Sequence, residues 1–111
     1  MLSPIFDIPF ESNKDWKVWM LDHALQHDII FSKLTTLGKA IIKFPLMEAK
    51  EANDKDWANN HQLEHDAIYT VLGLAGMPDL ASSDLTKKEE WEAWQQLHQD
   101  VHAQINLTLG I

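Results

Sequence analysis

The sequence predicts an all-α fold, a three-helix bundle, from an internal repeat and from residues that typically begin and end helices. The segments WMLDHALQHDIIFSKL, WANNHQLEHDAIYTVL and WQQLHQDVHAQINLTL begin at Trp19, Trp57 and Trp94, which are 38 and then 37 residues apart. All three fit WxxxHxxxHxxIxxxL. At about 100° per residue in a helix, the five shared positions fall on one stripe roughly 80° wide, whereas in a strand they would divide between two faces. The repeat therefore predicts three amphipathic helices with pseudo-threefold symmetry.

The three helices are expected near residues 13–37, 54–73 and 87–109, within a single domain that comprises residues 1–111. A side chain able to accept a hydrogen bond from a free helical amide stands at each expected start. These N-cap candidates are Ser12, Asn53 and Thr86, the last of which forms a TxxE capping box with Glu89. Glycine, which readily adopts the left-handed conformation found at helix ends, follows the apolar residues of each copy at Gly38, Gly73 and Gly110.

The segments ahead of the helices contain proline and run to roughly a dozen residues, longer than most connections in helical bundles. They are expected either to pack along the bundle or to cross it and allow the helices to run parallel. Helix direction decides which histidines meet. An up-down-up bundle would group His23 with His65 and His98, and His27 with His61 and His102. A parallel bundle would group His23 with His61 and His98, and His27 with His65 and His102; the sequence leaves both arrangements open.

All six histidines of the chain belong to the repeat, so either arrangement predicts two layers of three imidazoles. Three converging imidazoles can bind zinc or another late transition metal. The candidate metal ligands are His23, His27, His61, His65, His98 and His102. Glu64, at the edge of the stripe, is the one acidic residue placed to join them. The alternative is a metal-free layer in which the imidazoles form hydrogen bonds with one another, with tryptophan or with water.

The segment HQLEH, residues 61–65, also fits the HxxEH pattern of some zinc peptidases. The equivalent segments HALQH and HQDVH lack the glutamate, so a repeated scaffold accounts for the histidines and no enzymatic activity is expected. Hemerythrin-like and ferritin-like bundles use four helices and several carboxylate ligands. A hemerythrin-like or other His-rich helical metalloprotein, binding oxygen, a redox metal or a small ligand, is the alternative function.

The composition disfavours two classes of partner. The chain carries 17 acidic and 9 basic residues, all of the latter lysine, for a net charge of -8. Nucleic acids and anionic membranes are therefore not expected partners, because binding them requires clustered cations. The chain has no cysteine, which excludes disulfides. We expect no signal peptide, and no apolar run reaches the roughly 20 residues that span a bilayer.

The first predicted helix has a second apolar side, away from the histidines. It comprises Val18, Leu21, Leu25 and Ile29. A helix that is apolar on two sides packs against two partners. Either the connectors cover one side and a neighbouring subunit the other, or the connectors cover both; the sequence leaves the two alternatives open. We expect a homo-oligomer or packing against other structural proteins of an assembly.

The combination of Trp, HxxxH and a closing LGI in a chain of this length resembles small proteins encoded among the virion genes of tailed bacteriophages. The resemblance implies a non-enzymatic structural component of a virus particle, at the tail or the head-to-tail junction. It also implies that the protein is found in the virion; otherwise a cytoplasmic location is expected.

Overall fold

The computed structural model describes residues 5, 8, 16–39, 41 and 54–111. These residues form three helices, α1 (Trp16–Thr36), α2 (Lys55–Val71) and α3 (Lys88–Leu109), and contain no strand. The all-α, three-helix fold class predicted from the repeat is confirmed. None of the described helices combines the length and the apolar character needed to cross a bilayer.

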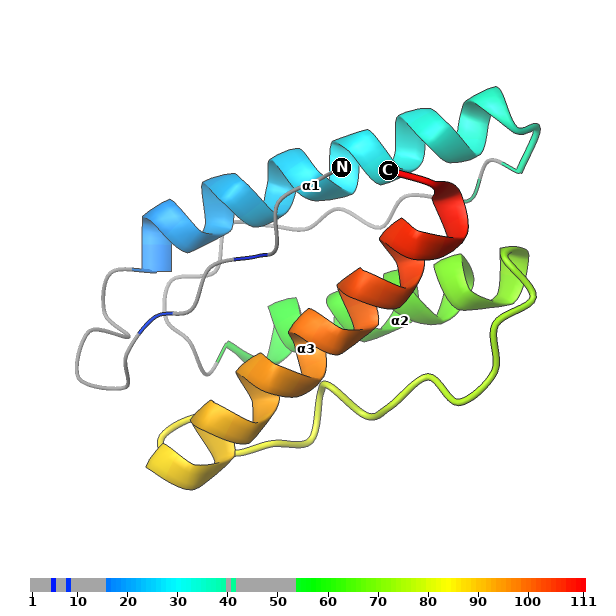
Figure 1. The fold of residues 1–111 in the computed structure, drawn as a ribbon. Coiled ribbons are helices and arrows are strands. Elements are labelled where there is room, and N and C mark those ends of the chain that lie inside the picture. The colour runs from blue at the N-terminus through cyan, green and yellow to red at the C-terminus, as the bar shows by residue number, and fades with distance from the viewer. Residues whose placement is uncertain (1–4, 6–7, 9–15, 40, 42–53) are drawn as a thin grey trace.

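All three helices run in the same direction, with their first turns at one end of the bundle and their last turns at the other (Figure 1). Equivalent positions of the repeat therefore lie side by side, and the Trp19 ring lies 5.8 Å from both the Trp57 and the Trp94 rings. α2 has 17 residues. At 1.5 Å per residue a helix of that size is about 25 Å long, so the chain must travel that distance back before α3 begins. This return explains why the connectors are long.

The core follows the repeat from the first turns of the helices to the last. The tryptophans are followed by the histidines, and the histidines by aliphatic side chains. The repeat isoleucines are completely buried: Ile30, Ile68 and Ile105. The last repeat positions belong to the same core, with Leu34 and Leu109 buried and Leu72 partly buried against them. The bundle thus has an aromatic and polar half and an aliphatic half.

The connector between α2 and α3 lies against both helices and is held by side chains of the repeat. Gln62 accepts a hydrogen bond from the Leu80 amide at 2.6 Å and donates one to the Pro78 carbonyl at 3.1 Å. The indole of Trp94 donates to the Leu80 carbonyl at 2.9 Å. These bonds satisfy backbone groups that packing would otherwise leave unpaired.

Residues before α1 are held in the same way on α3. Gln95 accepts from the Ile8 amide at 2.7 Å and donates to the Ile8 carbonyl at 3.0 Å, and the Trp91 indole donates to the same carbonyl at 2.9 Å. Gln99 donates to the Ile5 carbonyl at 2.7 Å. Ile5 and Ile8 are both buried, so these two residues pack on the bundle.

The helix ends agree in part with the predicted signals. Gly38, Gly73 and Gly110 have φ values of 70–71°, the left-handed conformation predicted for them. Ser12 and Asn53 lie outside the described residues. Asp54 is the N-cap of α2, where its carboxylate accepts a hydrogen bond from the Trp57 amide at 3.2 Å.

The capping box predicted for Thr86 and Glu89 is wrong. The N-cap of α3 is Lys87, which makes no side-chain capping bond. Asp84 accepts hydrogen bonds from both the amide and the hydroxyl of Thr86, at 3.1 and 2.5 Å, so the threonine belongs to the turn ahead of the helix. The Thr86 hydroxyl, which a capping box would place at the start of the helix, is instead hydrogen-bonded to the nearby carboxylate of Asp84.

The second apolar side of α1 is open to solvent. Val18, Leu21 and Leu25 are 63%, 74% and 60% exposed, and Ile29 is half-buried. The described part of the connectors, residues 5, 8, 41 and 72–87, therefore leaves this side open.

Candidate metal centre

A layer of three tryptophans closes one side of the histidine cluster. In each helix, the tryptophan ring stacks on the ring of the histidine four residues later, because these positions lie above one another on a helix. The centroids are 4.5–4.8 Å apart and the ring planes differ by 11–15°. The stacked pairs are Trp19 with His23, Trp57 with His61, and Trp94 with His98. This stacking fixes the position of one histidine on each helix.

These three histidines, His23, His61 and His98, form the first histidine layer. Their ring centroids make a nearly equilateral triangle with sides of 4.8, 4.9 and 4.9 Å. The same ring nitrogen points inward from each of them. His61 Nε2 lies 3.0 Å from His23 Nε2 and 3.2 Å from His98 Nε2.

His27, His65 and His102 form the second histidine layer, one helical turn further on. Their centroids are separated by 4.7, 4.9 and 5.0 Å. His27 Nε2 lies 3.3 Å from His102 Nε2. Of the two groupings that the sequence left open, the structure has the one that belongs to parallel helices.

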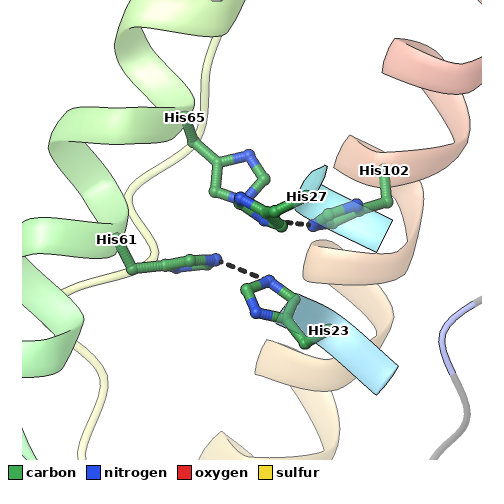
Figure 2. A group of neighbouring side chains, drawn as sticks. All are labelled: His23, His27, His61, His65 and His102. Carbon is green, nitrogen blue, oxygen red and sulfur yellow. Dashed lines mark hydrogen bonds between the residues drawn. The ribbon is translucent and has the colours of Figure 1, made fainter. Parts of the chain in front are cut away.

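The two layers lie close enough to act as one group. Five histidines each offer a ring nitrogen, and these five atoms all lie within 4.8 Å of one another (Figure 2). They are His23, His27, His61, His65 and His102. The sixth candidate, His98, is not one of this set, but its Nε2 atom is adjacent to that of His61. Metal ligation by the six histidines stays a prediction.

Glu64 lies behind this group and contacts it through a single imidazole. His27 Nδ1 donates to Glu64 Oε1 at 2.6 Å. The glutamate is 1% exposed, and its other carboxylate oxygen has no hydrogen-bond partner in the described part of the chain. The bond to Glu64 orients the His27 ring so that its Nε2 atom faces the cluster, 3.3 Å from the Nε2 atom of His102. The sequence placed Glu64 beside the histidines, but its partner depends on helix direction and was not predictable.

The cluster is almost completely shielded from water. All six histidines are at most 2% exposed. Burial, reinforced by the neighbouring imidazoles, lowers the pKa of five of them well below the usual value of 6.5: His23, His61, His65, His98 and His102. These rings are therefore neutral at pH 7, and neutral imidazole is the form that binds metals.

No protein-family model, curated protein or solved structure matches the chain. Function must therefore be inferred from the chemistry of the molecule itself. Its most distinctive feature is the buried group of five histidines, whose ring nitrogens lie close enough together to be compatible with a bound metal ion.

Proposed function

We propose that the chain is a non-enzymatic structural protein in which a late transition metal, bound by the histidine cluster, ties three parallel helices together. The observation that carries the proposal is the meeting of three Nε2 atoms in the first histidine layer. His61 Nε2 lies within 3.0–3.2 Å of the Nε2 atoms of both His23 and His98. Zinc, copper, iron and nickel all accept imidazole ligands of this kind.

Hydrogen bonding alone accounts poorly for these contacts. A neutral ring nitrogen carries either one N–H or one in-plane lone pair. His61 Nε2 therefore cannot form well-directed hydrogen bonds with two other Nε2 atoms at the same time. A shared ion removes the conflict, because all three lone pairs then point at the ion.

His65 and Glu64 also favour a bound cation. Neither ring nitrogen of His65 has a hydrogen-bond partner in the described residues, although the ring is completely buried. A buried polar atom left unpaired costs about 1–3 kcal/mol. Glu64, which accepts from His27, places a carboxyl group beside the cluster, where a cation would stabilise its ionised form. A bound ion would also supply a partner for one nitrogen of His65.

The burial of the cluster favours a structural role over a catalytic one. Catalytic zinc sites keep a coordination position open to water or substrate. Here the imidazoles are at most 2% exposed, so a substrate would reach them only after the helices separate. A visible spectrum that changes reversibly with oxygen would instead favour the hemerythrin-like alternative.

We also propose that the metal-tied bundle assembles with copies of itself within a larger structure, the virion in the case that the phage resemblance implies. The exposed apolar side of α1, formed by Val18, Leu21 and Leu25, supports this role. Sedimentation should show a homo-oligomer that the change Leu21→Glu converts to monomer. A chain that is monomeric at all concentrations, and missing from purified particles, would contradict the assembly role.

Metal binding is tested by titrating the untagged, chelator-stripped chain with divalent zinc, nickel or cobalt. We expect saturable binding of the metal ion, together with a rise in the melting temperature of the chain. The double change His61→Gln with His65→Gln should abolish binding, because it removes one ligand from each layer. The matched control is Gln96→Ala, which alters an exposed side chain on α3 and should bind as the native chain does. Equal binding by the double variant would contradict the proposal.

A further inference from the structure

We infer that the two histidine layers form one six-coordinate site for a single divalent ion, with one nitrogen from each of the six histidines. The inference rests on the metal binding proposed above and specifies its geometry and the class of ion. Three features of the cluster lead to it: the distances within the layers, the rotation of one layer relative to the other, and the small size of the whole group.

The distances within the layers suit six-fold coordination. With metal–nitrogen bonds of about 2.1 Å, adjacent ligands lie about 3.0 Å apart in an octahedron and about 3.4 Å apart in a tetrahedron. The Nε2 atoms of His61 and His23 are 3.0 Å apart, and those of His61 and His98 are 3.2 Å apart. The 3.3 Å between His27 and His102 in the second layer is closer to the tetrahedral separation. The 3.0 Å pair and the stagger of the layers therefore carry the argument for six ligands.

The layers are staggered, as the two opposite faces of an octahedron are. The His23 ring lies 4.1 Å from His27 and 5.2 Å from His102, but 6.4 Å from His65. An imidazole centroid lies about 3.2 Å from an ion bound at Nε2, so opposite centroids should be about 6.4 Å apart, given bonds of about 2.1 Å. His23 and His65 therefore have the separation of opposite ligands.

The other two helices repeat this stagger. The His61 ring lies 4.3 Å from His65 and 5.6 Å from His27. The His98 ring lies 4.5 Å from His102 and 5.5 Å from His65. Each ring of the first layer thus has two near neighbours in the second, one on its own helix and one on the next helix. In an eclipsed arrangement each ring would have only one.

The size of the group fits one ion. Opposite nitrogens in an octahedron with bonds of about 2.1 Å are about 4.2 Å apart. Five nitrogens, which come from both layers, all lie within 4.8 Å of one another. His98 is not one of this set, and its Nε2 atom, 3.2 Å from that of His61, has to move toward the other ligands when the ion binds. A separate ion in each layer would divide this set.

The geometry also selects a class of ion. Zinc usually takes four ligands in proteins, whereas nickel, cobalt and iron in the divalent state accept six nitrogens. Among these three, affinity for nitrogen ligands increases from iron to cobalt to nickel. Six neutral imidazoles leave the charge of the ion uncompensated, and Glu64 would offset part of it through His27. The site is therefore expected to prefer nickel or cobalt over zinc at equal availability.

Cobalt provides the most direct test, because octahedral Co²⁺ absorbs weakly near the blue-green and tetrahedral Co²⁺ absorbs intensely in the red. The stripped, untagged native chain is titrated with Co²⁺ alone. We expect saturation at about one ion per chain with weak absorption, and X-ray absorption of the Ni²⁺ form with six nitrogen neighbours at about 2.1 Å. Intense red absorption, four nitrogen neighbours or two ions per chain would overturn the six-coordinate site while leaving metal binding intact. No binding would overturn both.

Single changes show whether both layers contribute. His98→Gln and His102→Gln should each weaken Ni²⁺ binding by at least tenfold in competition with a chelator, and Glu64→Gln by about 10- to 100-fold, the usual effect of losing an outer-sphere partner. Gln96→Ala is the control and should leave the affinity unchanged. Circular dichroism identifies any variant that fails to fold. A folded His98→Gln chain with native affinity would overturn the inference, because it would confine the ion to the second layer.

Discussion

The two halves of the bundle share one axis and one repeat, but they are stabilised by different physical effects. In the aliphatic half, Ile30, Ile68 and Ile105 are completely buried, and each such side chain contributes about 1.5–3 kcal/mol by leaving water. In the polar half, six imidazoles are equally buried, and their nitrogens cost free energy wherever they lack a partner. The aliphatic half is thus stabilised by burial of apolar surface, whereas the stability of the polar half depends on what its nitrogens bind.

Of the changes described here, removal of the metal should lower the stability of the chain most. Structural metal sites contribute on the order of 10 kcal/mol at neutral pH, comparable to the whole stability of a small domain. Chelation should therefore unfold the chain or lower its melting temperature by tens of degrees. Calorimetry with and without chelator, followed by restoration with Ni²⁺, measures this. An unchanged melting curve would mean that the polar half needs no ion.

Acid should be the next strongest perturbation of the metal-free chain. Five histidines have pKa values well below 6.5 in the folded state, because burial disfavours their charged form. As pH falls below 6.5, the unfolded chain takes up protons that the folded chain does not, so stability decreases. Well below pH 6.5 the slope approaches an upper limit of about 1.4 kcal/mol per pH unit for each histidine that stays neutral in the folded chain. Urea denaturation between pH 7.5 and 5 measures the slope, and a flat profile would contradict the burial of neutral rings.

A cavity in the aliphatic half should have a smaller effect that does not involve the ion. Ile68→Ala removes a completely buried side chain and should cost about 2–5 kcal/mol. Because Ile68 lies beyond the histidine layers, the metal content of the folded variant should equal that of the native chain. Denaturant titration together with metal analysis checks both statements. Loss of the metal from a folded Ile68→Ala chain would show that the two halves are coupled.

The smallest expected effect concerns the connector that covers the polar half. Gln62→Ala removes the bonds to the Leu80 amide and the Pro78 carbonyl and should cost about 1–3 kcal/mol. Gln96→Ala, an exposed change in the neighbouring helix, should cost less than about 0.5 kcal/mol. Paired denaturation curves give both values. Equal costs would mean that the connector contributes little to stability.

The repeat made much of this structure predictable. It placed every histidine on one helical stripe, because the spacing of the shared positions is periodic and local in sequence. It could not choose between the two groupings of histidines, because helix direction depends on the path of the connectors. Connector length was compatible with both arrangements. The partner of Glu64 depended on the same choice, since His27 becomes its neighbour only when α1 and α2 are parallel.

Local hydrogen bonds limited the remaining predictions. Thr86 fits the capping box in sequence, yet Asp84 takes its hydroxyl two residues away. The glutamines that hold the connectors were not predicted either, although Gln62 and Gln99 occupy equivalent positions of the second and third copies. Their equivalent positions in the repeat were a sequence signal that the two glutamines share a role. That role could not be predicted, because it depends on connectors that lie along the bundle.

The central claim, that the histidine cluster holds a metal ion, is tested most directly by the metal content of the chain as it is purified. The protein should be made without an affinity tag and without chelator, and analysed by plasma mass spectrometry against its measured concentration. We expect about one late transition metal ion per chain and a large fall in melting temperature when the ion is removed. A folded, stable chain that carries no metal and binds none when nickel, cobalt or zinc is added would contradict it.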